Sequence, residues 1–140
     1  MARHDIALVD DDPHILTLLD DLFSEEGYRT LAISAGADAF ATIAHEAPDL
    51  VVLDLWLERQ ATGWDIYNRL RADDATAGIP VIICSADVGT LRERAAEIAA
   101  RGDATIEKPF DIASLLALVS DLLTLPHPRP LSIALRSENE

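Results

Sequence analysis

A chain of 140 residues, 49% hydrophobic and 26% charged, is long enough for one domain with a full core and too apolar to be wholly disordered. Its net charge of -14 argues against direct nucleic-acid binding, because affinity for a phosphate backbone comes largely from lysine and arginine contacts. The sequence has no apolar run of bilayer length, and its single cysteine, Cys84, cannot form an internal disulfide. We therefore expect a cytoplasmic protein without membrane contact, and a first segment that leads into a strand rather than a signal peptide.

Short apolar runs alternate along the chain with stretches of helical spacing. This alternation is typical of repeated βα units and predicts a doubly wound α/β domain with a five-stranded parallel sheet. The five predicted strands comprise residues 6–9, 28–33, 50–53, 80–84 and 104–107.

The first and last helices have clear sequence signals. The first is predicted to begin after Asp12 as N-cap, with Pro13 at its first position, and to end near Gly27. The last is predicted from a core-facing apolar stripe that follows Asp111. That stripe consists of Ile112, Leu115, Leu116, Val119 and Leu123.

The middle of the chain gives weaker signals. The fourth helix carries only a thin apolar stripe of Leu91, Ala95 and Ile98 among charged residues, which predicts a weakly anchored element of the kind that moves. At the end of the third helix, a solvated group of charges is predicted. It consists of Arg69, Arg71, Asp73 and Asp74.

Residues 126–140 differ in character from the rest, with three prolines among the first five residues. Alternating prolines favour extended polyproline II backbone. We expect one domain over residues 1–125 and a proline-rich tail over residues 126–140 that is too short to form a second core.

Carboxylates stand at the ends of two predicted strands. Asp10 and Asp11 follow the first strand, and Asp54 ends the apolar run of the third. If these strands are neighbours, their carboxyl ends place all three groups in one pocket at the edge where open α/β sheets bind ligands. Like charges so close together require a counter-charge, so the pocket predicts a hard divalent cation and a basic side chain.

Two further side chains are predicted at the same edge. Lys108, the one lysine of the sequence, follows the fifth strand, where a compact ammonium could reach the carboxylates. Ser85 follows the fourth strand, where its hydroxyl could donate to an anionic oxygen. Either residue alone means little, but their order and spacing together are specific.

Four segments together resemble the receiver domain of bacterial two-component response regulators, and the resemblance extends from residue 5 to about residue 123. It implies a flavodoxin-like sheet in the order 2-1-3-4-5 with five helices. The segments are Leu8-Val9-Asp10-Asp11-Asp12-Pro13, Val51-Val52-Leu53-Asp54-Leu55, Pro80-Val81-Ile82-Ile83-Cys84-Ser85-Ala86 and Lys108-Pro109-Phe110.

The resemblance also implies roles for individual residues. Asp54 would be the phosphoacceptor, taking a phosphoryl group from a phosphohistidine of a sensor histidine kinase or a phosphotransfer protein. Lys108, in a cis peptide with Pro109, and Ser85 would hold phosphoryl oxygens. The implied Mg²⁺ ligands are Asp10, Asp11, Asp54 and the backbone carbonyl of Trp56.

The sequence departs from the family pattern at three places. Thr105 stands where an aromatic switch residue is usual, so the switch is expected to rest on Ser85 and Thr105. Trp56 follows the phosphoacceptor by two residues, where smaller side chains are common. Residues 58–63 lack the usual proline and are one residue longer than typical.

Three functional classes remain open. The favoured one is a single-domain response regulator that acts through a downstream protein partner or a phosphorelay, with possible dimerisation through the face of the fourth helix, fifth strand and fifth helix or through the tail. The second is a Mg²⁺-dependent phosphatase of the aspartyl-nucleophile type, although Trp56 occupies the position of its usual second carboxylate. The third is a pseudo-receiver that binds partners without phosphorylation.

Overall fold

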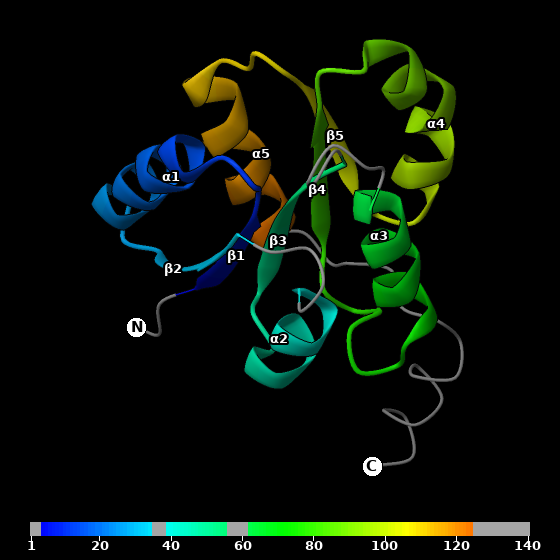
Figure 1. Cartoon of the computed structure of the whole chain (residues 1–140), viewed down its shortest axis with the longest axis horizontal. Coiled ribbons are helices and arrows are strands. Elements are labelled where there is room, and N and C mark those ends of the chain that lie inside the picture. The colour runs from blue at the N-terminus through cyan, green and yellow to red at the C-terminus, as the bar shows by residue number, and fades with distance from the viewer. Residues whose placement is uncertain (1–3, 35–38, 56–61, 125–140) are drawn as a thin grey trace.

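The computed structural model describes residues 4–34, 39–55 and 62–124, in which strands and helices alternate as the sequence predicts (Figure 1). Trp56, the rest of the loop up to residue 61 and residues 125–140 with the predicted tail lie outside the described residues. The strands are β1 (Asp5–Val9), β2 (Arg29–Ile33), β3 (Leu50–Asp54), β4 (Val81–Ser85) and β5 (Ala104–Glu107). The helices are α1 (Pro13–Glu25), α2 (Ala39–Glu46), α3 (Thr62–Ala72), α4 (Val88–Ala100) and α5 (Ile112–Thr124).

The strands form one parallel sheet in the order β2-β1-β3-β4-β5, which confirms the doubly wound sheet predicted from the sequence pattern and the flavodoxin-like order implied by the resemblance. Helices α1 and α5 cover one face, and α2, α3 and α4 cover the other (Figure 1). The strand order reverses direction beside β1 and β3. Their carboxyl ends therefore open onto the crevice where such sheets bind ligands.

Strands β3 and β4 lie in the middle of the sheet and are buried along their whole length. Successive side chains of a strand point to opposite faces. Val51 and Leu53 accordingly pack beneath α2, α3 and α4, whereas Leu50 and Val52 pack beneath α1 and α5. Burial on both faces explains why these strands read as continuous apolar runs.

Helix α1 begins as predicted. The Asp12 carboxylate accepts a hydrogen bond from the backbone N–H of His14 at 2.9 Å, and Pro13 occupies the first position of the helix. The helix ends at Glu25, and Gly27 has a φ of +91°, which an L side chain rarely adopts. The Asp12 cap fixes where β1 turns into α1, next to the carboxylates, and Gly27 marks the turn towards β2.

The strand ends differ slightly from expectation. Ser85 was expected just after the fourth strand, but it is the last residue of β4, paired in register with Glu107 of β5. Asp54 is likewise the last residue of β3, paired with Cys84. Ladder hydrogen bonding continues past the last apolar residue, because it depends on the backbone and not on the side chain. Among the described residues, no helix is long and apolar enough to cross a membrane.

Candidate functional site

Three carboxylates converge at the carboxyl ends of β1 and β3. One oxygen from each of Asp10, Asp11 and Asp54 lies within 4.8 Å of the other two. Asp10 and Asp54 are buried, whereas Asp11 is exposed at the mouth of the site. A cluster of carboxylate oxygens with an open side suits a hard cation such as Mg²⁺, which takes oxygen ligands and keeps some of its waters.

Lys108 reaches these carboxylates from the other end of the chain. Its ammonium donates hydrogen bonds to Oδ2 of Asp10 at 2.9 Å and to Oδ2 of Asp54 at 3.0 Å. Burial would lower the pKa of Lys108, but the hydrogen bonds and charges of the two carboxylates outweigh burial and raise that pKa above its ordinary value. The ammonium therefore stays charged and provides the basic group that the cluster requires.

The backbone around Lys108 places its side chain. Its peptide bond to Pro109 is cis, as the resemblance implied, and its backbone N–H donates to the carbonyl of Ser85 at 2.9 Å. On the opposite side of the cluster, the N–H of Asp12 donates to Oδ1 of Asp10 at 2.9 Å. The carboxylate of Asp10 is thus held at both oxygens.

Below the carboxylates the site is closed by apolar side chains. The packing leaves a cavity of only about 10 Å³ there, bordered by Leu8, Val52, Cys84 and Phe110 among others. Burial raises the pKa of the Cys84 thiol to about 12, with opposing contributions from the nearby charges. An apolar floor strengthens the ion pairs above it, because charges attract more strongly where water is excluded.

Ser85 lies at this edge on β4 and is fully buried. Its Oγ accepts a hydrogen bond from the backbone N–H of Asp87 at 2.9 Å, which leaves the hydroxyl proton available to another acceptor. Asp87 is the N-cap of α4, and its carboxylate accepts from the N–H of Thr90 at 3.3 Å and from the Thr90 hydroxyl at 2.7 Å. Ser85 therefore links the site directly to the start of α4.

Gly63 belongs to the site although the sequence analysis gave it no role. Its N–H donates to the carbonyl of Leu55 at 3.1 Å, and a Cβ added at Gly63 would lie 2.3 Å from the carbonyl oxygen of Asp54. Only glycine permits this approach of α3 to the end of β3. In the sequence, a glycine at the start of a helical segment was the feature that could have indicated this close approach.

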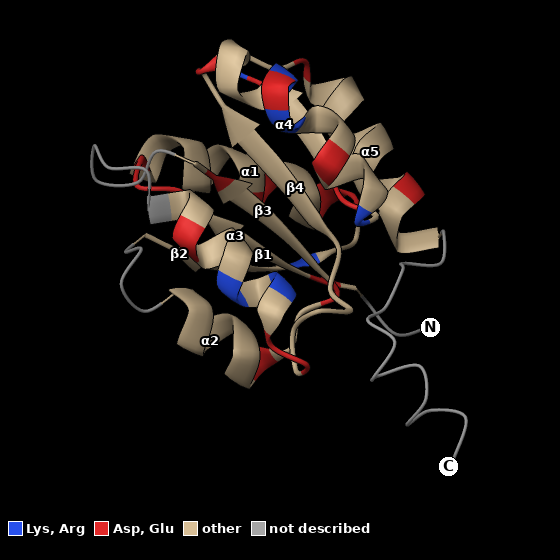
Figure 2. Cartoon of the chain, turned by 90° about the vertical axis from the view of Figure 1, so that its right-hand side faces the viewer, with Lys and Arg blue, Asp and Glu red and all other residues tan. Residues whose placement is uncertain are grey.

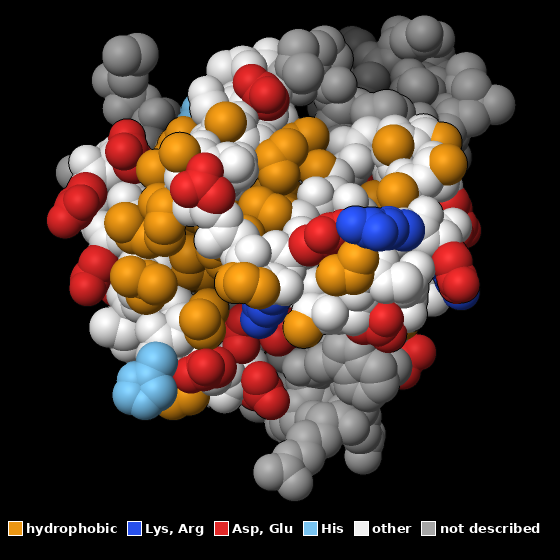
Figure 3. Space-filling view, turned by 90° about the horizontal axis from the view of Figure 1, so that it is seen from above, with side chains coloured by type: hydrophobic (Ala, Val, Ile, Leu, Met, Phe, Trp, Pro, Cys, Tyr) orange, Lys and Arg blue, Asp and Glu red, His pale blue; other side chains and the backbone are white. Residues whose placement is uncertain are grey.

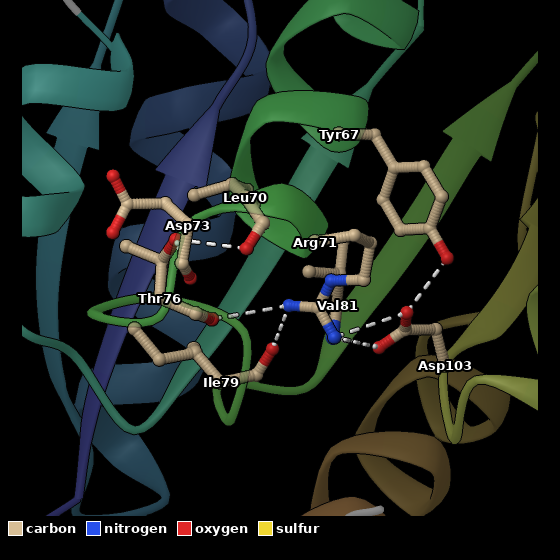
Figure 4. Close-up of polar contacts among 8 residues, drawn as sticks. All are labelled: Tyr67, Leu70, Arg71, Asp73, Thr76, Ile79, Val81 and Asp103. Carbon is tan, nitrogen blue, oxygen red and sulfur yellow. Dashed lines mark hydrogen bonds and ion pairs between the residues drawn. The ribbon is translucent and has the colours of Figure 1, made fainter. Parts of the chain in front are cut away.

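A buried polar network lies at the opposite end of α3 and α4 (Figure 4). The Tyr67 hydroxyl donates to Asp103 at 2.7 Å, Arg71 lies 3.3 Å from the same carboxylate, and the N–H of Val81 donates to it at 2.8 Å. Arg71 also donates to the carbonyls of Thr76 and Ile79. Burial lowers the pKa of Arg71 and raises that of Tyr67, the latter together with its bond to Asp103.

The expectation of a solvated cluster at the end of α3 is therefore wrong for Arg71. Its side chain is only 10% exposed, because its partner Asp103 comes from the turn between α4 and β5, 32 residues away. Sequence spacing could not reveal that partner.

Thr105 has a different setting from the other predicted site residues. It pairs with Ile83 in the sheet and lines a wide groove of about 670 Å³ between β5 and α5. The same groove is bordered by acidic side chains at positions 107, 111 and 121. Thr105 thus lies on the face of β5 and α5, away from the carboxylate cluster.

A second groove, of about 380 Å³, borders the site itself and is strongly apolar. Lys108 lies at its edge, and Leu18 on its rim is 46% exposed. Figure 3 looks onto this edge of the sheet and shows hydrophobic side chains gathered on the side of α1 and α5. The other lining residues are Ile15, Leu19, Ala86, Pro109, Phe110 and Ile112.

The family model of the response regulator receiver domain matches residues 6–120. The chain belongs to the response regulator receiver family. It is 34% identical over 118 residues to RpaA of Synechocystis, a DNA-binding dual master transcriptional regulator, and that match covers 84% of this chain and 48% of RpaA. The chain thus spans about half the length of the curated relatives it matches.

Solved receiver domains have the same fold. The receiver domain of HemR from Leptospira biflexa is 26% identical with a TM-score of 0.77, over 91% of this chain and all of that one. The receiver domain of the sensor histidine kinase PA1611 from Pseudomonas aeruginosa is 24% identical with a TM-score of 0.76, over 89% of this chain and all of that one. The PA1611 structure holds a magnesium ion in its active-site cleft.

Proposed function

We propose that this receiver accepts a phosphoryl group on Asp54 from the phosphohistidine of a sensor histidine kinase or a phosphotransfer protein. The observation that carries the proposal is the position of Lys108, whose ammonium bonds Asp10 and Asp54 at once within a cluster of three carboxylates. Family membership supports the same role for the site.

The chemistry follows from the groups at the site. An oxygen of Asp54 attacks phosphorus, the bond from phosphorus to the donor imidazole nitrogen breaks, and its electron pair stays on the imidazole. The charge that builds on the phosphoryl oxygens faces the Lys108 ammonium and the Ser85 hydroxyl. An aspartyl phosphate results. Attack of water on its phosphorus then breaks the bond to the Asp54 oxygen, releases inorganic phosphate and restores the carboxylate.

The carboxylates of Asp10, Asp11 and Asp54 fit a Mg²⁺ ion. We assign these three residues as its protein ligands, together with the backbone carbonyl of Trp56, as the resemblance implies. When bound, the ion would reduce the repulsion between the carboxylate and the incoming phosphoryl group. Asp11 is the exposed member of the set, so it borders the side from which solvent waters would complete the coordination.

The apolar groove beside Lys108 is the surface on which the donor protein would dock. A phosphohistidine can reach Asp54 only if its protein covers this edge of the sheet, and the groove offers apolar area there, including exposed Leu18. An amphipathic helix bearing the histidine next to an apolar residue has the complementary chemistry. We assign the output to phosphorylation-dependent protein binding or a phosphorelay, with Ser85 and Thr105 on the route to the face of α4, β5 and α5.

Labelling with acetyl phosphate and Mg²⁺, followed by intact-mass measurement, tests the proposal. The wild type should gain one hydroxylamine-sensitive phosphoryl group, and Asp54→Asn should gain none. Asp12→Asn is the matched control, because asparagine also caps a helix and Asp12 lies beside the site. Equal labelling of Asp54→Asn and the wild type would contradict the assignment of Asp54.

A further inference from the structure

The seam between α3 and α4 is built from aromatic rings on α3 and from two guanidinium groups, that of Arg94 on α4 and that of Arg101, the C-cap residue of α4. The Arg94 guanidinium lies 4.9 Å from the centre of the Trp64 ring, and that of Arg101 lies 5.6 Å from the centre of the Tyr67 ring. Trp64 and Tyr67 meet edge to face, with ring centres 6.0 Å apart. Figure 2 shows charged residues of both signs interspersed along α4.

Apart from the seam, α4 is held by two buried side chains and by its packing against β5, which includes the ion pair between Arg92 and Glu107. Its buried side chains are Leu91 and Ile98, which face the core beneath α2, α3 and α4. The remaining contacts with α3 come from long side chains, which can slide without opening the core. Side-chain contacts of this kind are weak individually, so a small change at one end of α4 can shift its position.

The two ends of α4 differ in how firmly they are held. The turn after α4 contains Asp103, which is 5% exposed and bonded to Tyr67, Arg71 and the N–H of Val81. Losing a partner there would leave a buried charge uncompensated, so this end is fixed. The start of α4 instead depends on the Asp87 cap, whose N–H bonds Ser85 in the candidate site.

Trp64 directly follows the residue that touches the phosphoacceptor strand. Gly63 has no room for even a methyl group against the carbonyl of Asp54, so a shift in the backbone of Asp54 or Leu55 must move the first turn of α3. Trp64 would carry such a shift to Arg94. The N-terminal half of α4 is therefore in contact with the site by two routes, through Ser85 and through Trp64.

We propose that the contact between Trp64 and Arg94 couples occupancy of the Asp54 site to the N-terminal half of α4, which pivots about the Asp103 network. The proposal rests on the proposed function. It places the aromatic residue of the switch on α3, at Trp64. The position on β5 where an aromatic switch residue is usual holds Thr105 in this chain. The Asp54 site and the contact between Trp64 and Arg94 are two distinct sites, and the N-terminal half of α4 is the element that moves between them. The coupling between the two sites can therefore be measured.

Hydrogen exchange with and without beryllofluoride and Mg²⁺ tests the pivot. In the wild type, the change should be concentrated in residues 88–94 and small in residues 98–103. Arg94→Gln, which keeps a long polar side chain on the exposed face, should lose more than half of the change in residues 88–94. The affinity for beryllofluoride should shift by about two- to fivefold, the size expected for one exposed contact between a cation and a ring.

Two variants separate the seam from other roles of these charges. Arg92→Gln removes the same charge from the same helix, but Arg92 pairs with Glu107 of β5 at 3.2 Å and not with α3. Glu97→Gln removes the ion pairs of Arg94 and Arg101 at 3.4 and 3.3 Å while leaving both guanidinium groups in place. Both variants should keep the wild-type exchange pattern.

Fluorescence gives an independent readout. In a Trp56→Phe background, Trp64 is the one tryptophan, and its emission should change on addition of beryllofluoride. A wild-type exchange pattern in Arg94→Gln, or no change at residues 88–94 in a wild type that binds beryllofluoride, would overturn the coupling. Failure of the wild type to bind beryllofluoride or accept a phosphoryl group would instead contradict the proposed function.

Discussion

The ammonium of Lys108 lies 3.0 Å from Oδ2 of Asp54, although 54 residues separate them in the sequence. The same ammonium bonds Asp10 at 2.9 Å, so one cation balances two buried carboxylates. This arrangement gives Lys108 two opposed effects. It stabilises negative charge in the site, and it competes with any metal cation for the same oxygens.

Replacing Lys108 should separate these two effects. We expect Lys108→Met to bind Mg²⁺ more tightly than the wild type, because a competing positive charge is gone. Its phosphorylation by acetyl phosphate should slow by about 100-fold or more, as expected when one group that stabilises developing charge is removed. Mg²⁺ titration by calorimetry and mass-based labelling measure the two effects.

Asp11→Ala is the control for the metal arm, because it removes one of the three clustered carboxylates without touching Lys108. Mg²⁺ affinity should fall in this variant. Weaker Mg²⁺ binding in Lys108→Met than in the wild type would show that the ammonium does not compete with the cation.

Gly63→Ala should destabilise the protein. The new methyl group would meet the carbonyl oxygen of Asp54 at 2.3 Å, so the start of α3 must shift, at a cost of about 1–3 kcal/mol. Gly89→Ala in α4 is the matched control, since its nearest neighbour would be Oδ1 of Asp87 at 3.8 Å. Alanine there should stabilise by about 0.5–1 kcal/mol. Urea denaturation measures both, and equal stability of the two variants would disprove the close approach.

The Tyr67 hydroxyl should contribute measurably to stability. Tyr67→Phe removes a buried donor from Asp103 and should cost about 1–3 kcal/mol in the free energy of unfolding. Tyr28→Phe is the control, because the Tyr28 hydroxyl makes no hydrogen bond with any of the described residues. A loss of similar size in both variants would mean that the network adds nothing specific.

Cys84 should react slowly with iodoacetamide in the folded protein at pH 9 and rapidly in denaturant. Burial raises the pKa of its thiol from the ordinary 9.0 to about 12, so little thiolate forms. The folded state holds the thiol proton more tightly than the unfolded state does. The contribution of this proton to the free energy of unfolding is therefore complete below pH 9.0 and declines as the pH rises towards 12. Cys84→Ala should lose less stability over that range. Equal labelling rates in the folded and unfolded protein would contradict this.

The sequence by itself determined the class of fold and the charged groups of the candidate site, but not the role of Gly63. Apolar runs of strand length alternating with helical spacing specify a parallel sheet, because strands buried on both faces must be apolar throughout. Parallel strands bring their carboxyl ends to one edge, so Asp54 was expected beside Asp10 and Asp11 on the condition that the first and third strands are neighbours, an order that the family resemblance implied and the structure has. The single lysine could be assigned to that edge for the same reason.

Only the tertiary structure decided which contacts lie between elements far apart in the chain. Arg71 reads as a solvated charge because its partner, Asp103, belongs to a turn that packs against α3 only after folding. Gly63 reads as an ordinary helix start until the carbonyl of Asp54 is seen against it. Local spacing sets which face a residue occupies, whereas the distance between two faces is set by the packing of the whole domain. The seam between α3 and α4 is therefore a property of the fold, not of any segment of the sequence.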